Sequence, residues 1–343
     1  MMKGVVKFAR GNGNVELRET AEPTLVPGHV LIRVAACGIC GTDLHIFHDE
    51  YPTNPPVILG HEMAGTVVDV ASDVASVQVG ERVTALTYSY TCGTCRFCRS
   101  GRINLCPNRR SFGSGVDGAM ARWLVVPARN VLALPANVDE VTGAMTEPLA
   151  CCVRGIVDYA NPRPGDVVVI SGPGPIGLLS SLVALTTGAT IVILGLSTDE
   201  RRLDIARQIG VHHVLDVQQV DVARYVRDLT GGDGADVVVE CAGAEKSAQT
   251  CLEVVRRGGS YVQMGLFGSP IRFDLTQVTM REIALAGPFA TLPGTWSRTL
   301  RLMGEGRLDP RPVLSDELSL EEWAEGFRKA EAKDAGKVVL RPE

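Results

Sequence analysis

The chain has 343 residues, of which 45% are apolar and 21% are charged, and its formal net charge is −5. This length allows two domains of ordinary size, and the composition is that of a globular protein. The acidic balance argues against a surface that attracts nucleic acid. The N-terminal stretch MMKGVVKFARGNGN lacks the apolar core of a signal peptide, so we expect a cytoplasmic protein with reduced cysteines.

The first part of the chain, residues 1–152, contains short alternating apolar runs separated by Gly and Pro, which predicts an irregular, mainly β domain. Strands are expected in HVLIRVAAC (29–37), GTVVDVASDV (65–74), ERVTALT (81–87) and ARWLVVPA (121–128).

The same domain carries four closely spaced cysteines: Cys92, Cys95, Cys98 and Cys106. A disulfide staple, a redox centre, a nucleic-acid zinc module and a structural metal site are all candidates. In a reducing compartment such a cluster indicates metal binding or catalysis. Five arginines surround it, but few aromatic residues accompany them and the protein is acidic, so a solvated basic lobe is favoured over a nucleic-acid module.

Residues 167–198 carry no charge and are long enough to span a bilayer. The segment SGPGPIG interrupts them after four residues, and its two prolines would break a membrane helix. The flanking runs VVVI and IVILGL are rich in β-branched residues. A strand, a glycine turn, a helix and a second strand are therefore predicted, and no membrane partner.

From residue 153 to 290 predicted strands alternate with predicted helices, which indicates a parallel, doubly wound sheet and an α/β domain. Strands are expected in DVVVIS, TIVILG, HHVLDV, ADVVVECAG and SYVQMGL, and helices in DERRLDIARQIG, VARYVRDLTGG and AQTCLEVVRRGG. Residues 291–343 should pack back on the first domain, with a capping box from Ser319 to Glu322 and a last strand in KVVLRP.

A G-x-G-x-x-G motif follows the first strand of this α/β domain and opens its first helix. Its members are Gly172, Gly174, Pro175, Ile176 and Gly177. The first glycine permits the tight turn, the second lets the backbone approach a pyrophosphate, and the third lets the helix pack on the sheet. The context predicts a dinucleotide site with phosphates at the helix N-terminus, and a ligand-free turn is the lesser alternative.

The next strand ends in ILGLSTDERR and supplies no acid at the place where NAD enzymes bind the adenosine ribose. Ser197 and Thr198 leave room there for a 2′-phosphate, which Arg201 or Arg202 could neutralise. The sequence therefore leans to NADP. A register shift of one or two residues would instead bring Asp199 onto the ribose of NAD.

Three segments offer groups for a catalytic metal. CGICGTDLHIF supplies Cys37, Cys40, Thr42, Asp43 and His45, GHEMAG supplies His61 and Glu62, and MTEPLACC supplies Glu147. A thiolate, an imidazole and a carboxylate, with one position left open, are typical of catalytic zinc.

These segments resemble the zinc-containing medium-chain alcohol dehydrogenase family, in particular its sorbitol, butanediol and threonine dehydrogenase-like branch. The resemblance is carried by GHEMAGTVVDVASDV, GICGTDLH, the four-cysteine loop, TEPLA and GPGPIG, and it covers essentially the whole chain. It implies a GroES-like, mainly β catalytic domain built from both chain ends and a Rossmann domain between them.

By this resemblance Cys40, His61 and Glu62 are the catalytic zinc ligands, with Glu147 near or on the metal. Thr42 and His45 would relay the substrate proton, Asp43 would orient a metal ligand, and Cys37 would lie in the core. The cluster Cys92, Cys95, Cys98 and Cys106 matches a structural zinc lobe, so two zinc ions per chain are expected.

The expected reaction is NAD(P)-linked interconversion of a secondary alcohol or polyol and its ketone, by a homodimer or homotetramer. An aldehyde-handling dehydrogenase or dismutase of the same fold, and a non-catalytic nucleotide-binding regulator, are the alternatives. Polyol dehydrogenases of the family place an Arg-Tyr pair where this chain has Ala290 and Thr291, which weakens the expectation of a sorbitol-like substrate. Tyr51, Phe112 and Phe289 are candidate pocket walls.

Overall fold

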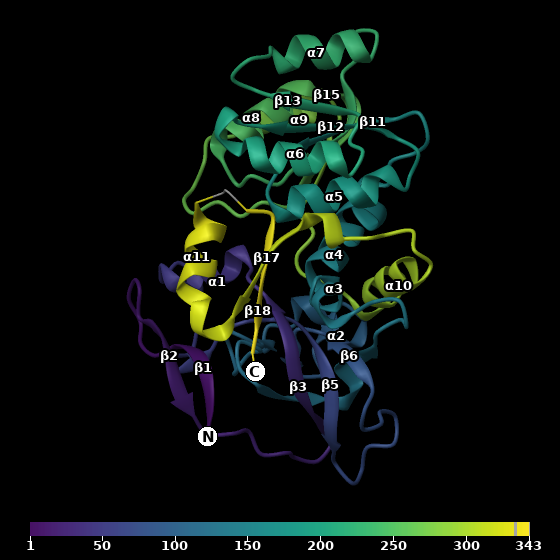
Figure 1. Ribbon diagram of the computed structural model, residues 1–343. Coiled ribbons are helices and arrows are strands. Elements are labelled where there is room, and N and C mark those ends of the chain that lie inside the picture. The colour runs from purple at the N-terminus through teal and green to yellow at the C-terminus, as the bar shows by residue number, and fades with distance from the viewer. Residues whose placement is uncertain (333–334, 343) are drawn as a thin grey trace. The chain divides into compact units, whose positions relative to one another are not determined.

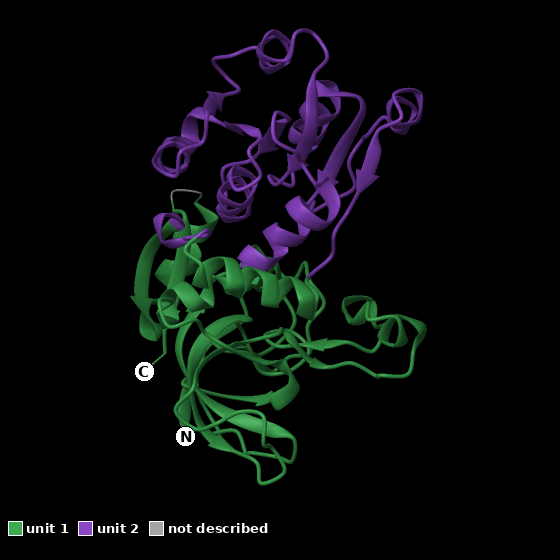
Figure 2. Ribbon diagram, turned by 90° about the vertical axis from the view of Figure 1, so that its right-hand side faces the viewer, with its two compact units in different colours: residues 1–147, 291–306, 314–343 green, residues 148–290, 307–313 purple. Residues whose placement is uncertain are grey.

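The computed structural model describes residues 1–332 and 335–342 (Figure 1). The chain divides into two compact units, shown in two colours in Figure 2. The first, unit 1, comprises residues 1–147, 291–306 and 314–343, and the second, unit 2, comprises residues 148–290 and 307–313. Residues 148–152 and 307–313 thus belong to unit 2. The domain boundaries expected from the sequence place them in the segments 1–152 and 291–343.

Unit 1 is built on a seven-stranded sheet. Across it the strands follow the order β10 (Val131–Ala133), β6 (Arg82–Ala85), β5 (Glu62–Val70), β3 (His29–Gly38), β18 (Lys337–Arg341) and β17 (Leu314–Ser319), and β9 (Trp123–Pro127) also pairs with β3. The four strands expected in residues 29–128 are confirmed. The expected C-terminal strand is β18, which pairs antiparallel with β3 and so joins the end of the chain to its first part.

Smaller elements complete unit 1. A three-stranded sheet contains β2 (Val15–Thr20), β1 (Met2–Lys7) and β4 (Val57–Ile58), and a two-stranded one contains β7 (Tyr88–Tyr90) and β8 (Arg110–Ser111). The helices are α1 (Gly41–Phe47), α2 (Arg96–Arg99), α3 (Glu140–Ala144), α10 (Pro293–Gly304) and α11 (Trp323–Glu331), with single 3-10 turns at Ile103–Leu105, Ala128–Asn130 and Leu320–Glu322. The predicted capping box is present at the last of these turns, where Ser319 N–H donates to the Glu322 carboxylate at 2.9 Å.

Apolar residues of β3 and β5 hold this unit together. In β3, Val30, Ile32 and Val34 point to one face and are at most 1% exposed, as the period-two alternation of the sequence predicts. They belong to a single apolar cluster with residues of β5, β6, β9, α11 and β18. Cys37, expected in the core, is a fully buried member of that cluster.

Unit 2 contains a six-stranded, entirely parallel sheet, which confirms the doubly wound α/β prediction. Its order is β13 (His213–Asp216), β12 (Thr190–Gly195), β11 (Val167–Ser171), β14 (Ala235–Glu240), β15 (Val255–Gln263) and β16 (Ala284–Ala286). The central strand β11 is buried along its whole length, as expected for a strand covered on both faces. Because the order reverses between β11 and β14, the crevice for a ligand is expected at their carboxyl ends.

The helices of unit 2 connect these strands. They are α5 (Pro175–Leu185), α6 (Glu200–Gln208), α7 (Val222–Leu229), α8 (Glu245–Val254) and α9 (Leu275–Met280), with 3-10 turns at Ser197–Asp199 and Arg311–Val313. The helix α4 (Thr146–Val153) continues into a π-helical stretch at Arg154–Ala160. The sequence expectation of a helix through residue 259 is wrong, because β15 begins at Val255; Gly258 has a φ of +66°, a conformation that glycine tolerates.

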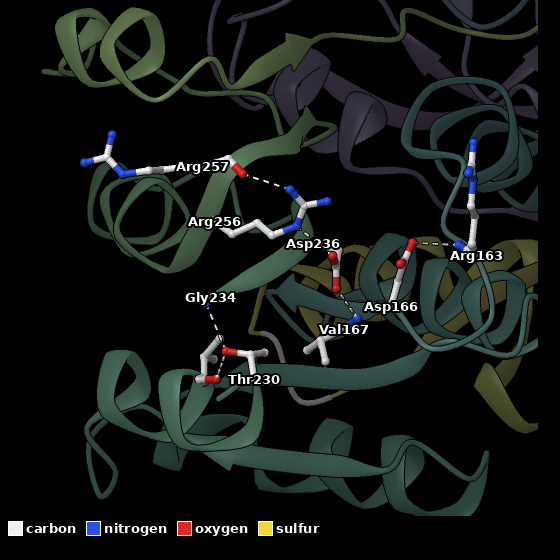
Figure 3. Close-up of polar contacts among 9 residues, drawn as sticks. Arg163, Asp166, Val167, Thr230, Gly234, Asp236, Arg256 and Arg257 are labelled. Atoms are coloured by element: carbon white, nitrogen blue, oxygen red, sulfur yellow. Dashed lines mark hydrogen bonds and ion pairs between the residues drawn. The ribbon is translucent and has the colours of Figure 1, made fainter. Parts of the chain in front are cut away.

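At the amino ends of the unit 2 strands, Asp236 ties three elements together (Figure 3). One carboxylate oxygen of Asp236 accepts the Val167 N–H of β11 at 2.8 Å, and the other accepts Arg256 Nε of β15 at 2.7 Å. This contact is structural, and it lies at the end of the sheet opposite to the G-x-G-x-x-G turn. Within the described ranges, the structure contains no helix with the length and apolar character needed to cross a membrane.

Candidate active site

A possible metal site lies in unit 1 where α1 and β5 begin. The ligand atoms of Cys40, His61 and Glu62 all lie within 4.8 Å of one another. Cys40 immediately precedes α1, and Glu62 is the first residue of β5, opposite Gly38 of β3. Two short segments, one with Cys40 and one with His61 and Glu62, thus converge on one point although they are 21 residues apart in the sequence. A thiol, an imidazole and a carboxylate are the donor set of an open zinc site.

Asp43 supports these three groups from within α1. Its side chain is fully buried; Oδ2 accepts the Cys40 N–H at 2.9 Å, and Oδ1 lies 3.8 Å from His61 Nδ1 without a hydrogen-bond partner. Burial alone would lower the pKa of His61, but the nearby Cys40 and Asp43 raise it well above the usual range. An orphaned buried carboxylate oxygen facing the candidate ligand histidine fits the role of orienting a metal-bound imidazole.

Lys337 of β18 contacts Glu62 and was not expected from the sequence. Its ammonium donates to Glu62 Oε1 at 2.6 Å and to the Ile39 carbonyl at 2.8 Å, and it is also paired with Oε2. Both side chains are almost completely buried, with exposures of 2% and 0%. The sequence did offer a signal for this pair: Lys337 begins the apolar strand KVVLRP, and a lysine is rarely buried without a charged partner.

Gly38 makes room for this ion pair. A Cβ on Gly38 would lie 2.1 Å from Glu62 Oε2 and 2.9 Å from Lys337 Cε. Any side chain at position 38 would displace the Glu62 carboxylate from its place beside Cys40 and His61. Burial would lower the pKa of Lys337, but Glu62 and then Cys40 outweigh it and raise the pKa above its ordinary value.

Glu147 is not one of the three residues whose ligand atoms converge. It lies in the first turn of α4, is 7% exposed, and its charge helps to raise the pKa of His61. Among the described residues, the group within 4.8 Å contains Glu62 rather than Glu147. The geometry places Glu62 with Cys40 and His61 and leaves Glu147 farther away.

The two residues expected to move a proton lie on α1. Thr42 and His45 are three residues apart and therefore share a helix face. Both are partly exposed, and His45 Nδ1 is 2.7 Å from Glu50 Oε2. The His45 imidazole thus has an exposed carboxylate partner, Glu50. The sequence analysis did not predict this contact.

The four-cysteine lobe is compact. Cys92 Sγ lies 4.0 Å from Cys98 Sγ and 3.6 Å from Cys106 Sγ. These separations bracket the spacing of about 3.8 Å for thiolates around a tetrahedral zinc with 2.3 Å bonds, and are far too long for a disulfide.

Backbone N–H groups point at sulfur in this lobe, as they do around thiolate ligands. Cys95 N and Cys98 N each donate at 3.4 Å, to Cys92 Sγ and Cys95 Sγ respectively. The N–H groups of Cys95 and Thr94 lower the pKa of Cys92 to about 6. The lobe is therefore a ligand set suited to a closed tetrahedral metal site.

The glycine motif in unit 2 has the geometry that a dinucleotide site requires. Gly172 has a φ of +103°, and a Cβ on Gly177 would lie 1.8 Å from the Gly172 carbonyl oxygen. Gly174 is the N-cap of α5 and has open space around it, with Pro175 at the first helical position. Ile176 is in the first turn, where its carbonyl accepts the Cys152 thiol at 3.4 Å. The N-terminus of α5 is thus open to a phosphate.

The segment after β12 differs in part from the sequence expectation. Ser197 and Thr198 are exposed, and the Ser197 hydroxyl bonds to Asp216 Oδ2 from the neighbouring strand β13. Asp199 is buried, and its carboxylate accepts the Leu196 N–H at 2.9 Å. The register shift that would bring Asp199 onto a ribose is therefore disfavoured, and Asp216 is an acid that sequence reasoning overlooked.

The two arginines of α6 differ in accessibility. Arg201 is exposed, whereas Arg202 is 5% exposed and lies on the buried face of the helix. Arg201 is therefore the better placed of the two for a ligand phosphate.

The residues expected near the substrate differ in how far they are buried. Phe112 is 5% exposed and belongs to the core of unit 1. Thr291 is fully buried, donating its N–H to the Tyr88 hydroxyl at 3.0 Å and accepting Trp296 Nε1 at 2.7 Å. Tyr51 packs partly buried against the core of unit 1, and Phe289 of unit 2 is 43% exposed.

Comparisons with known proteins cover the whole chain. Residues 26–136 match the family described as alcohol dehydrogenase GroES-like domain, and residues 175–305 match zinc-binding dehydrogenase. The chain is 39% identical over 342 residues to a sorbitol dehydrogenase of Halalkalibacterium halodurans, with 99% of each chain covered. It is 35% identical to a D-arabitol-phosphate dehydrogenase of Enterococcus avium, covering 99% of this chain and 97% of the relative.

A solved structure of similar fold is a zinc-binding dehydrogenase from Sinorhizobium meliloti 1021, bound to NADP. It superposes with a TM-score of 0.90 and 33% identity, over 100% of this chain and 99% of the other.

The buried pair of Glu62 and Lys337 predicts a stability effect. In the zinc-free protein, Lys337→Met leaves the buried Glu62 carboxylate without a cation and should destabilise unit 1 by about 3–5 kcal/mol, as breaking a buried ion pair does. Thermal unfolding followed by circular dichroism measures it. The double variant Lys337→Met/Glu62→Gln should recover much of the lost melting temperature. Equal melting temperatures for the single variant and the unmodified protein would contradict the pair's importance.

Proposed function

The chain belongs to the zinc-containing medium-chain alcohol dehydrogenase family and is a zinc-dependent NAD(P) alcohol or polyol dehydrogenase; we propose that it interconverts a secondary alcohol or polyol and its ketone. The observation that carries this proposal is the convergence of Cys40, His61 and Glu62 beside the Thr42-bearing helix α1. The relatives named for sorbitol and arabitol phosphate oxidation support a polyol-like substrate.

In this proposal Cys40, His61 and Glu62 hold a catalytic zinc, with Glu147 close enough to act on the site by its charge. Bound there, zinc would polarise the alcohol oxygen and lower its pKa. Asp43 Oδ1, 3.8 Å from His61 Nδ1, would orient the metal-bound imidazole, and Lys337 holds the Glu62 carboxylate in place. The protein thus positions a thiolate, an imidazole and a carboxylate before substrate arrives.

Thr42 and His45 provide the proton path in the proposal. The Thr42 hydroxyl would accept the substrate hydroxyl proton and pass on its own, and His45 would carry the proton outward. Glu50, at 2.7 Å from His45 Nδ1, orients the ring and faces solvent with a side-chain exposure of 48%.

The cofactor site is proposed at Gly172, Gly174, Pro175, Ile176 and Gly177, which would hold the pyrophosphate of a nicotinamide cofactor; when bound, that cofactor would supply the hydride chemistry. NADP is favoured slightly over NAD. Gly195 ends β12 without an acid, and Arg201 is exposed in the following helix. The NADP bound to the relative from Sinorhizobium meliloti supports this choice. Asp216 beside Ser197 opposes it, because its charge would repel a 2′-phosphate.

A homo-oligomer and a cytoplasmic location complete the proposal. The edge strand β16 exposes Leu285, and the adjacent α9 exposes Leu275 and Met280. Exposed apolar residues along an unpaired sheet edge support association of two copies.

The metal content is the first testable consequence. The purified protein should contain about two zinc ions per chain, one in each type of site. Cys106→Ser should remove the ion of the lobe and lower stability, whereas Cys40→Ser should remove the other ion and abolish turnover. Elemental analysis of protein prepared without chelators measures both. A zinc content unchanged by Cys40→Ser would contradict the catalytic site.

Turnover on a panel of polyols, secondary alcohols and ketones, with NAD and with NADP, tests the reaction itself. On the best substrate, Thr42→Val should lower kcat by roughly a hundredfold, because a positioned proton carrier is lost. Its zinc content should not change. Thr66→Val, at a half-buried strand position of the same unit, is the matched control and should retain activity. Activity confined to aldehydes would favour the alternative reaction class.

The cofactor preference can be tested at two positions. Arg201→Ala should reduce kcat/KM for NADP while sparing NAD, and Asp216→Asn should improve NADP because it removes a repelling charge. The ratio of kcat/KM values for the two cofactors is the readout. A preference of the unmodified enzyme for NAD by about a hundredfold, or ~2.7 kcal/mol, would refute the lean to NADP.

A further inference from the structure

The carboxylate of Glu240 lies at the end of β14 and is completely buried in unit 2. Oε1 accepts the Ala242 N–H at 2.9 Å, the Gly243 N–H at 3.0 Å and the Ser247 hydroxyl at 2.6 Å. Oε2 accepts the Gly243 N–H at 3.1 Å and the Gln263 amide at 2.5 Å. All five of these contacts come from uncharged donors, so the carboxylate acts only as an acceptor that organises its neighbours.

The segments that meet at Glu240 surround the point where the strand order reverses. Glu240 pairs with Ser171, the last residue of β11 and the residue before Gly172. The Ser171 and Ser247 hydroxyls are 2.7 Å apart, which continues the chain of hydrogen bonds from Glu240 to β11. Cys241 N–H donates to the Ser171 carbonyl at 2.8 Å. Glu240 therefore connects β11, β14 and α8 at the predicted crevice.

Close packing transmits the position of this loop to the glycine motif. A Cβ on Gly172 would lie 2.8 Å from Ala242 N, so the motif turn and residues 241–243 are in direct contact. On the other side, a Cβ on Gly265 would lie 2.4 Å from Gly243 N and 2.6 Å from Glu240 Oε2. The loop cannot shift without moving the turn that faces a pyrophosphate.

We propose that Glu240 is a positioning residue for the dinucleotide: its carboxylate fixes residues 171–172, 241–243 and 263–265 in the arrangement that accepts the cofactor. The inference rests on the dinucleotide site of the proposed function. An acid is required because each oxygen receives at least two donors. Glutamine would turn an amide N–H₂ toward one of these donor sets, and the loop would have to move away.

Gln263 does not relieve that conflict. Its amide N–H₂ donates to Glu240 and to the Gly265 carbonyl at 2.9 Å, and its Oε1 accepts the Tyr261 hydroxyl at 3.2 Å. Rotating the amide to suit a glutamine at position 240 would break the contacts with Gly265 and Tyr261.

The test is the dissociation constant of the zinc-loaded protein for NADH and for NADPH, measured by fluorescence titration without substrate. Glu240→Gln should raise it at least tenfold for both cofactors. Ser247→Ala, which removes one of the five contacts to Glu240 and the link to Ser171, should raise it severalfold. The zinc content and far-UV circular dichroism spectrum should match those of the unmodified protein, and kcat at saturating cofactor should change less than the cofactor KM.

Asp236→Asn is the matched control, because Asp236 lies on the same strand but binds Val167 and Arg256 at its other end (Figure 3). It should lower the melting temperature without changing cofactor affinity. The proposal is overturned if Glu240→Gln binds both cofactors normally, or if Asp236→Asn weakens binding equally. If Glu240→Gln does not fold, normal binding by Ser247→Ala overturns it. Failure of the unmodified protein to bind either cofactor would instead refute the dinucleotide part of the proposed function.

Discussion

The buried ion pair between Glu62 and Lys337 is the contact on which the candidate metal site of unit 1 depends. It joins β18 at the end of the chain to the first residue of β5, and Gly38 of β3 provides the space for it. Removing two charges from water is costly unless they meet each other in good geometry. The pair therefore links β18 to β5 beside the candidate metal ligands, and the C-terminal strand becomes part of the site that the N-terminal motifs supply.

Unit 2 also contains a buried carboxylate, that of Glu240, but it is stabilised in a different way. Glu240 is surrounded by backbone amides, a hydroxyl and a carboxamide, whereas Glu62 is paired with an ammonium. Uncharged donors stabilise a carboxylate and also fix the backbone from which they project. The ion pair thus joins distant strands, and the donor cluster shapes a loop. Each arrangement suits its place, beside a metal site in one unit and beside a glycine turn in the other.

Local patterns predicted much of this protein, and long-range partners escaped them. The strand β12, the motif glycines and the four-cysteine lobe were predicted from short segments, whereas the pairing of Cys40 with His61 was expected only from the resemblance to a known family. Lys337 and Asp216 were not predicted, because each acts on a residue far away in the sequence. The helix predicted through residue 259 ends earlier because Val255 pairs with Ala235 of β14, and Gly258, with a φ of +66°, is not helical.

Cofactor choice illustrates why a single strand end is an incomplete guide. The end of β12 lacks an acid, which alone favours NADP, but parallel pairing brings β13 beside it in register, so that Gly195 is opposite Asp216. The Ser197 hydroxyl then bonds to that acid, and a carboxylate reaches the region from the neighbouring strand. The charge that a 2′-phosphate would meet is the sum of Asp216 and Arg201. Because these two oppose each other, small changes at either position should shift the preference, and a lean rather than a strict choice is the expected behaviour.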